Sequence, residues 1–339
     1  MELKKRYTKG KRIYSGPYSD VYEGKDDVNL AAVALKVVDI DITIKPHNIR
    51  QEIAILQKLN HKGVLECIAT FEDVEDVYLV TPLFRYNLDQ LLQAKFTRRT
   101  TKFNLEDMTT NSISVRSTIS NSTIESFLVP LVDSVSYLHE NGIIHRDLKP
   151  TNIYFADDDI SKPVIGDFGI SYDTSSQRQM TAEDPKHKYT DVCSKLYKAT
   201  ELCFGVTDYG VEIDTWSLGI IFTVVYSSDF RSILEKYEVF NDISLINGIF
   251  HCFGTPYVAP ETDGDPLYWP QMNDGEKYHF KAFEFVRYPR RPSQELLPRC
   301  ENTIVLGLFD RMMVYQSDRR LTAKELNHAL SGQEAQSIE

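Results

Sequence analysis

Paired cysteines, clustered histidines and long apolar runs are all missing from this chain. Its five cysteines are dispersed along the sequence, at Cys67, Cys193, Cys203, Cys252 and Cys300. An odd and scattered set favours a reducing environment over a disulfide framework, and the absence of CxxC and HExxH spacings argues against a zinc site. The longest apolar stretch, residues 216–226, is shorter than the roughly 20 residues that a membrane helix needs. It therefore predicts a buried helix.

Positive charge is also scarce. Lysine and arginine total 38 against 49 aspartates and glutamates, which gives a net charge of −11. Non-specific binding to nucleic acid or to an anionic membrane needs a basic face, so we expect neither partner. The basic residues 1–6 are followed by no apolar run, and a signal peptide is therefore not expected. We expect a cytoplasmic and/or nuclear protein, and the sequence does not choose between the two.

The most informative stretch is IIHRDLKPTN at residues 143–152, together with Asp167-Phe168-Gly169. Strand-forming residues flank Asn152, and a second such run at 163–165 leads into Asp167. If these runs pair, the hairpin brings Asn152 and Asp167 together, with Asp147 in the loop just before. Oxygen ligands placed in this way suit Mg²⁺, and Asp147 is left to receive a hydroxyl proton.

At these residues the chain resembles the eukaryotic protein kinases, whose catalytic loop reads HRDLxxxxN and whose metal-binding turn reads DFG. The resemblance implies an α+β, bilobal protein kinase fold with ATP and Mg²⁺ as cofactors. We expect a small, mostly β N-lobe with one helix at 1–84 and a larger, mostly helical C-lobe at 85–332. The C-lobe would carry an insertion at 94–122 and be followed by a polar tail at 333–339.

The place of the glycine-rich phosphate loop departs from the family pattern GxGxxGxV. Its three glycine positions hold Tyr14, Gly16 and Ser19, and Val21 is kept. Glycines let main-chain amides approach phosphates closely, and Pro17 has no amide hydrogen to offer. We therefore expect a weaker phosphate cradle than usual. The alternative is a plain β-hairpin with no role in ligand binding.

Lys36 ends the strand motif Val33-Ala34-Leu35-Lys36, and a lysine in an apolar strand needs a partner. Glu52 lies in a predicted helix over 46–56 that begins near a proline. By resemblance Glu52 pairs with Lys36, which then holds the α- and β-phosphates of ATP. For each residue taken alone there is an alternative: Lys36 as a charge on an edge strand that points to water, and Glu52 as a solvated helix charge.

The resemblance also assigns the remaining nucleotide contacts. The hinge between the lobes would be residues 81–84, where Pro82 offers only its carbonyl, Phe84 offers an amide, and Thr81 guards the pocket behind the adenine. The full set expected to bind the nucleotide is Ile13, Tyr14, Gly16, Val21, Ala34, Lys36, Glu52, Pro82 and Phe84.

The catalytic roles follow from the same resemblance. Asp147 would orient the substrate hydroxyl and accept its proton, and Lys149 would reach the γ-phosphate. Asn152 would act with them and would hold Mg²⁺ together with Asp167. A lysine at 149, with the asparagine three residues on, is the pattern of serine/threonine kinases.

Five further residues have expected structural roles. Ser194 would contact Asp147 and Lys149, with a turn or capping serine as its alternative. We also expect an ion pair between Glu201 and Arg320, an aspartate, Asp214, bonded to catalytic-loop amides, and a packed His145.

The predicted insertion at 94–122 breaks the apolar periodicity. Four basic residues are followed by many serines and threonines. We expect a solvated, partly mobile segment. The alternative is a docking site for an acidic partner.

Several departures from the general kinase pattern resemble the single-subunit yeast kinases that activate cyclin-dependent kinases. These departures are the depleted glycine loop, the hinge proline, the segment 44–48 and the segment 167–173. The resemblance implies a cyclin-dependent kinase as protein substrate and activity as a monomer, without a cyclin and without a phosphate on the chain's own loop. Asp191 would then serve Arg146.

Two other interpretations stay open. Residues 249–256 resemble the cyclin-dependent branch itself, which would need a cyclin against the helix at 46–59. The missing glycines fit a pseudokinase scaffold. The complete set Lys36, Glu52, Asp147, Asn152 and Asp167 argues against a scaffold.

Overall fold

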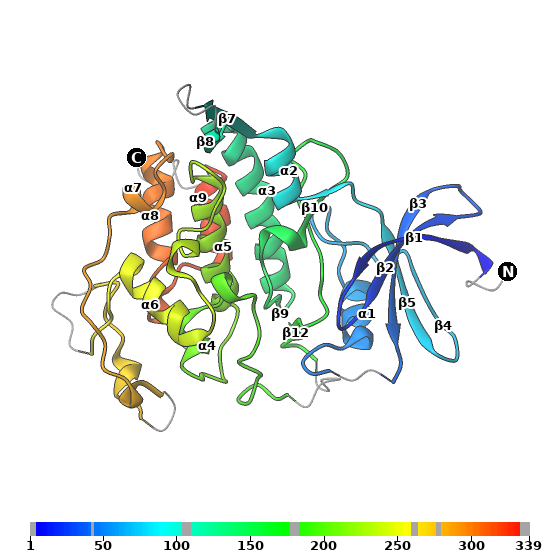
Figure 1. The fold of residues 1–339 in the computed structure, drawn as a ribbon. Helices are drawn as coiled ribbons and strands as arrows, with labels where there is room; N and C mark the ends of the chain where they lie inside the picture. The colour runs from blue at the N-terminus through cyan, green and yellow to red at the C-terminus, as the bar shows by residue number, and fades with distance from the viewer. Residues whose placement is uncertain are drawn as a thin grey trace.

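The computed structural model describes residues 5–41, 44–103, 110–176, 183–258, 264–275 and 279–332. The chain folds into a small lobe built on one sheet and a large, mostly helical lobe (Figure 1). This is the bilobal α+β fold expected from the sequence. The expected polar tail, residues 333–339, lies outside the described residues.

The small lobe holds a five-stranded antiparallel sheet in the order β1-β2-β3-β5-β4. Its strands are β1 (Tyr7–Ser15), β2 (Asp20–Asp26), β3 (Ala32–Asp39), β4 (Ala69–Glu72) and β5 (Asp76–Pro82). Side chains of β3 alternate between two faces, as the period of two in a strand requires. Val33, Leu35 and Val37 are buried on one face. Lys36 therefore points from the other face.

Helix α1 (Ile49–Lys58) packs beside this sheet (Figure 1). It begins at Ile49 because the Asn48 side chain accepts hydrogen bonds from the amides of Arg50 and Gln51. Glu52, Ile55 and Leu56 are buried on the inner face of the helix. The helix thus presents a carboxylate and an apolar stripe to the interior.

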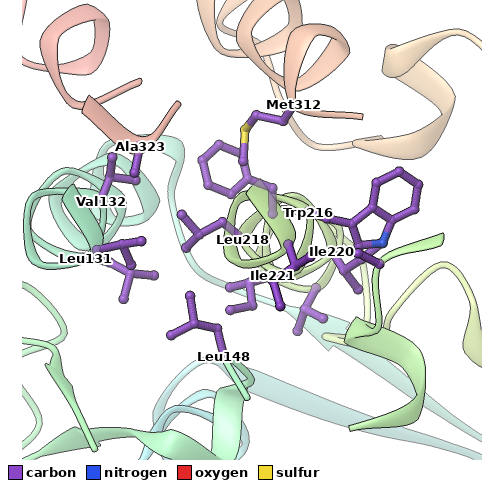
Figure 2. Packing of buried hydrophobic residues seen from close by; sticks show 14 of the residues in the cluster. Leu131, Val132, Leu148, Trp216, Leu218, Ile220, Ile221, Met312 and Ala323 are labelled. Atoms are coloured by element: carbon purple, nitrogen blue, oxygen red, sulfur yellow. The ribbon is translucent and has the colours of Figure 1, made fainter. Parts of the chain in front are cut away.

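The large lobe is built around α5 (Glu212–Val225), whose residues from Ile213 onward are all buried. Its other helices are α2 (Leu88–Lys95), α3 (Asn121–Glu140), α4 (Thr200–Cys203), α6 (Asp242–Phe253), α7 (Ser293–Leu296), α8 (Thr303–Met312) and α9 (Ala323–Leu330). The buried helix predicted at 216–226 is therefore present. Figure 2 shows Leu148 of the catalytic loop packed into this same core beside α5.

Short elements complete the large lobe. The strands are β6 (Tyr86–Asn87), β9 (Ile143–Ile144), β10 (Ile153–Phe155), β11 (Val164–Ile165) and β12 (Tyr172–Asp173), and the 3₁₀ helices are η2 (Pro150–Asn152), η3 (Lys195–Tyr197), η4 (Glu235–Tyr237), η5 (Pro270–Asn273), η6 (His279–Ala282) and η7 (Ser317–Arg319). In the described part of the chain, no helix combines the length and apolarity that crossing a bilayer would require.

The predicted insertion contains a β-hairpin, which the sequence analysis did not predict. Strands β7 (Thr97–Phe103) and β8 (Thr110–Ser117) pair antiparallel and extend from the large lobe (Figure 1). The base of the hairpin is closed by the Thr118 amide, which donates to the Phe96 carbonyl at 2.7 Å. Arg299 also donates to the Ser117 hydroxyl. Residues 104–109 lie outside the described part.

Among the described residues, the buried apolar side chains form two clusters of very different size. The large one runs through the C-lobe and continues into α1 and β5 through Ile55, Leu56 and Leu79. The small one lies on the sheet and consists of Tyr7, Val33, Leu35 and Val80. Most of the hydrophobic stabilisation therefore belongs to the C-lobe and to its junction with α1.

Candidate active site

The catalytic loop is held in place by the buried carboxylate of Asp214 on α5. One oxygen accepts the His145 amide at 2.8 Å and the other accepts the Arg146 amide at 2.9 Å. His139 also bonds Asp214, at 3.0 Å. Burial opposes ionisation of Asp214, but hydrogen bonds from His139 and from the His145 amide hold its pKa below the ordinary value. The structural role expected for Asp214 is present.

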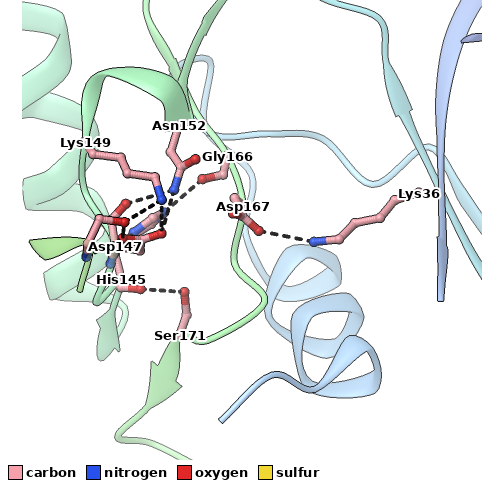
Figure 3. Close-up of polar contacts among 9 residues, drawn as sticks. Lys36, His145, Asp147, Lys149, Asn152, Gly166, Asp167 and Ser171 are labelled. Carbon is pink, nitrogen blue, oxygen red and sulfur yellow. Dashed lines mark hydrogen bonds and ion pairs between the residues drawn. The ribbon is translucent and has the colours of Figure 1, made fainter. Parts of the chain in front are cut away.

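His145 is packed within the loop, as the sequence predicted. Its Nδ1 accepts the Asp147 amide at 3.2 Å, and its Nε2 lies 3.0 Å from the Gly166 carbonyl (Figure 3). These two partners select the neutral tautomer with the proton on Nε2. The ring also meets Phe168 edge-on, with centroids 4.9 Å apart. His145 thus ties the catalytic loop to the Asp167-Phe168-Gly169 turn.

Asp147 is oriented through both carboxylate oxygens. Oδ1 accepts the amide and the hydroxyl of Ser194 at 2.9 and 2.8 Å. Oδ2 accepts Lys149 Nζ at 2.7 Å and Asn152 Nδ2 at 3.1 Å (Figure 3). Lys149 also donates to the Ser194 hydroxyl at 2.6 Å. The expected contacts of Ser194 with Asp147 and Lys149 are therefore both made.

Asn152 and Asp167 approach one another through the predicted hairpin. Strand β10 pairs with β11, with Ile153 opposite Ile165, and the Gly166 amide donates to the Asn152 carbonyl at 2.9 Å. Asp167 takes a left-handed backbone, with φ of 61°. This conformation is uncommon for a residue other than glycine, although aspartate tolerates it better than most.

The two side chains fit a magnesium site. Asn152 Nδ2 is used by the main-chain and side-chain oxygens of Asp147, which leaves Asn152 Oδ1 for a cation. Asp167 contributes a carboxylate that is partly open to the cavity. An amide oxygen and a carboxylate, completed by water and phosphate oxygens, form the kind of ligand set that Mg²⁺ prefers.

Lys36 forms the ion pair expected with Glu52. Its Nζ lies 2.9 and 2.8 Å from the two Glu52 oxygens and 3.2 Å from Asp167 Oδ1. Burial opposes a charge on Lys36, but the two carboxylates raise its pKa, so the ammonium stays protonated. Burial likewise opposes the charge on Asp167, and Lys36 brings the pKa of Asp167 down to about 2. A fixed cation and an ionised carboxylate therefore face the same space.

A cavity of about 680 Å³ separates the lobes at this point. Its lining includes most of the predicted nucleotide and metal residues, namely Ile13, Tyr14, Val21, Ala34, Lys36, Glu52, Pro82, Phe84, Asn152 and Asp167, together with Lys149. Gly16 and Asp147 are absent from the lining. This volume and its mixed polar and apolar walls are typical of a small-molecule site.

The hinge closes the inner end of the cavity. Thr81 is buried at 7% exposure behind the hinge. The Phe84 ring stacks on Tyr154 from the floor of the cavity, with centroids 5.7 Å apart. Among the described residues, no hydrogen bond reaches the Phe84 amide, so it is available as the donor that the sequence predicted.

Tyr14 at the roof packs against the one remaining glycine of the loop. A Cβ atom placed on Gly16 would lie 2.5 Å from the Tyr14 hydroxyl oxygen and within 3 Å of its ring. The ring thus packs directly on the Gly16 backbone. The absence of a side chain at Gly16 permits this close approach.

The partner of Arg146 is Glu183, and the expectation that Asp191 would serve it was wrong. Arg146 Nη1 donates to Glu183 Oε1 at 2.8 Å, and both side chains are buried. The same oxygen accepts the Tyr189 amide at 2.8 Å. Asp191 is exposed. The sequence carried no signal for Glu183, because it lies in a polar segment without periodicity.

A third ion pair stabilises the C-lobe below the site. Arg320 Nη1 and Nη2 donate to the two oxygens of Glu201 at 2.7 and 3.1 Å. The pair is buried and bidentate, which fixes its geometry. It is the pair that the sequence predicted.

Comparison with known proteins agrees with this geometry. The chain is similar to the serine/threonine-protein kinase CAK1 of Saccharomyces cerevisiae, with 36% identity over 210 residues, which are 56% of each chain. It therefore matches just over half the length of that kinase. It is 26% identical to the cell division control protein 2 homolog 3 of Trypanosoma brucei brucei, over 94% of this chain and 89% of the other.

Mouse cyclin-dependent kinase 11B is also 26% identical over 93% of this chain, but over only 35% of its own length. Among solved structures, the yeast RNA polymerase II CTD kinase complex CTDK-1 includes a chain of the same fold, with a TM-score of 0.70 and 23% identity over 96% of this chain and 90% of the other. The sequence model of the family described as protein kinase domain matches residues 7–330. This chain belongs to the protein kinase family.

Proposed function

We propose that this chain is a Mg²⁺- and ATP-dependent serine/threonine protein kinase whose substrate is the activation-loop threonine of a cyclin-dependent kinase. The observation that carries the enzymatic part is the arrangement around Asp147. This carboxylate is held by Ser194, Lys149 and Asn152, and the ionised pair of Lys36 and Glu52 lies across the cavity. A pseudokinase scaffold would not need an oriented carboxylate beside a cation-lined cavity.

The chemistry follows from these positions. Lys36 would bind the α- and β-phosphates of ATP, while Asn152 Oδ1 and Asp167 would hold Mg²⁺, which neutralises phosphate charge. Asp147 would orient the hydroxyl of the substrate and accept its proton as the new oxygen–phosphorus bond forms and ADP leaves. Lys149, bonded to both Asp147 and Ser194, would stabilise the negative charge on the transferred phosphoryl group.

Activity of the lone chain is supported by two ion pairs. The pairing of Lys36 with Glu52 is made between this chain's own β3 and α1. Arg146 pairs with the chain's own Glu183, and we infer that this carboxylate supplies the negative charge that an activating phosphate would otherwise bring. We infer that neither a cyclin nor phosphorylation of this chain is required.

The substrate assignment is supported by the similarity to the yeast CAK1 kinase, over just over half of each chain, and by the departures from the general kinase pattern that the sequence shows. The similarity to cyclin-dependent kinases favours one competing function, a kinase of that branch that itself binds a cyclin. We also propose a cytoplasmic and/or nuclear location, which is compatible with both of these functions.

One experiment separates these functions. The purified chain is incubated with Mg-ATP and an unphosphorylated, catalytically inactive cyclin-dependent kinase, with and without its loop threonine, and with no cyclin present. We expect phosphate on that threonine alone, and none when Asp147→Asn replaces the wild type.

Other outcomes would contradict the proposal. Transfer only after a cyclin binds this chain would favour the cyclin-dependent function. Failure to bind Mg-ATP at all would favour the scaffold. The oligomeric state during turnover, measured by light scattering, tests the expectation of an active monomer.

A further inference from the structure

Two rings meet at the outer end of the nucleotide cavity. Tyr18, in the turn between β1 and β2, stacks on His47, which lies just before the cap of α1. The ring centroids are 3.6 Å apart and the planes differ by 18°. The contact therefore joins the tip of the roof to the start of the helix that carries Glu52.

This stack lies beside the groups proposed to handle phosphate and metal. Tyr18 and His47 line the same cavity as Lys36, Lys149 and Asp167. A Cβ atom on Gly169 would lie 3.4 Å from His47 Nδ1, and the Asn48 amide donates to the Gly169 carbonyl at 3.0 Å. The stack thus closes the cavity at the phosphate end, beside the Asp167-Phe168-Gly169 turn.

The main chain of the turn between β1 and β2 has few amide groups that could bind a phosphate. Pro17 has no amide hydrogen, and the Gly16 amide already donates to the Ser19 carbonyl at 3.0 Å. The Tyr14 ring packs on the Gly16 backbone. A cradle built from loop amides is therefore reduced.

The rings are suited to a stacked contact. Burial lowers the pKa of His47, with Asp167 opposing that shift, and this direction favours the neutral ring, which stacks without a charge. Within the described residues, neither ring makes a hydrogen bond that would fix it elsewhere. Tyr18 keeps 37% of its surface exposed, so the stack lies at the rim and can open.

We propose that Tyr18 and His47 form an aromatic latch that holds the β1–β2 turn over the triphosphate, in place of the loop amides that this chain lacks. Both are positioning residues for the nucleotide and take no part in the chemical step. The inference rests on the proposed function, because it assumes that the cavity binds ATP. It adds a side-chain device for retaining the β- and γ-phosphates.

The test compares Tyr18→Ala and His47→Ala with wild type by calorimetric titration of Mg-ATP and of AMP. A stacked aromatic pair is worth a modest free energy, so we expect the Kd for Mg-ATP to rise roughly 2- to 12-fold in each variant. The Kd for AMP should change less than about twofold, because AMP has no β- or γ-phosphate beneath the latch. The value of KM for ATP should rise while kcat stays nearly constant.

Two further variants isolate the contact itself. Tyr18→Phe keeps the ring and should bind Mg-ATP like wild type. The double variant of Tyr18→Ala with His47→Ala should be no weaker than either single one, because coupled residues are not additive. Phe240→Ala is the matched control, since Phe240 is an aromatic residue with 72% exposure outside the cavity lining, and it should change neither Kd.

The possible results separate the latch from the proposed function. If wild type binds Mg-ATP and both alanine variants bind it equally well, the latch is wrong and the proposed function stands. If the variants lose AMP and Mg-ATP affinity together, or melt well below wild type, the stack is only structural and the latch is wrong. If wild type itself does not bind Mg-ATP, both proposals fall.

Discussion

At the scale of single residues, the carboxylates of this site are each held in one orientation by several hydrogen bonds. Asp147 receives four hydrogen bonds from three side chains and one amide, and Asp214 receives two main-chain amides and His139. A carboxylate with both oxygens occupied cannot rotate freely. The orientation of the proposed base is therefore set before any substrate arrives.

Replacing Asp147 by asparagine tests its role directly. The amide is nearly isosteric and can still accept from Ser194, but it cannot accept a proton from the substrate. A positioned base typically contributes about 10²–10⁴ in rate, so we expect kcat to fall by that order while the Kd for Mg-ATP stays within about threefold. Near-normal turnover of Asp147→Asn would remove Asp147 from the role.

Glu183→Gln tests whether a built-in carboxylate replaces an activating phosphate. The change leaves the buried Arg146 guanidinium without its counter-charge, and breaking a buried pair in this way costs about 3–5 kcal/mol. We expect a lower melting temperature and a large loss of kcat. Activity of the wild type should survive phosphatase treatment and should persist in Thr190→Ala.

Asp191→Asn is the matched control for that prediction. Asp191 is exposed, and exposed substitutions usually change stability by less than about 0.5 kcal/mol. If Asp191→Asn keeps the kcat of wild type while Glu183→Gln loses most of it, the role of Glu183 is supported. The reverse pattern would return the role to Asp191.

The depressed pKa of Asp214 sets an acid limit on stability. A group whose pKa is lower in the folded state stabilises that state fully above its unfolded pKa, near 3.8, and loses this contribution as the pH falls below it. We expect wild type to exceed Asp214→Asn by about 1–3 kcal/mol at pH 7. In urea unfolding series from pH 7 to pH 3, this gap should narrow below about pH 4. A gap independent of pH would contradict the assignment.

At the scale of elements, the hairpin of β7 and β8 is separable from the site. Its two ends meet at the base, where Thr97 is paired with Ser117, so a short turn can join them. We expect a variant with residues 98–116 replaced by a glycine-serine turn to bind Mg-ATP like wild type. Its free energy of unfolding should differ by only about 1 kcal/mol, because loop length enters stability weakly.

Arg299→Ala provides the contrast for the hairpin variant, since it removes contacts at the retained base and should destabilise more. Loss of Mg-ATP binding on hairpin removal would place the insertion in the site. A raised KM for a protein substrate, with an unchanged KM for a short peptide, would support the docking alternative.

At the scale of elements, some pairings and contacts could be predicted from the sequence and others could not. The pairing of β10 with β11 and the ion pair of Lys36 with Glu52 could be predicted, because motif spacing and the cost of a buried charge restrict the choices. The hairpin at Thr97–Ser117 could not, because its strands carry many polar residues and lack regular apolar alternation. Glu183 and the stack of Tyr18 on His47 depend on how distant segments meet in space, which no local pattern records.

At the scale of the whole molecule, the two lobes differ in how they are stabilised. The C-lobe shares one large apolar cluster with α1 and β5, while the outer part of the sheet relies on the small cluster of Tyr7, Val33, Leu35 and Val80. Local opening is cheapest where few apolar contacts must be broken. The strands β1 and β2 should therefore open more often than the rest of the molecule.

Hydrogen–deuterium exchange can measure this difference. We expect amides of β1 and β2 to exchange well before those of α3 and α5 in the nucleotide-free protein. Mg-ATP should slow exchange at β1 and β2, and AMP should slow it less if the ring stack retains the distal phosphates. Uniform exchange over both lobes would contradict the expectation.

The small apolar cluster under the roof has a consequence for the lifetime of the protein in a cell. Ligand at one hundred times its Kd adds about 2.7 kcal/mol to the state that binds it, which is a large increment for a segment with so little buried surface of its own. Depletion of nucleotide would leave β1 and β2, from Tyr7 to Asp26, as the described part most open to proteolytic cleavage. The supply of ATP would then govern the survival of the enzyme as well as its turnover.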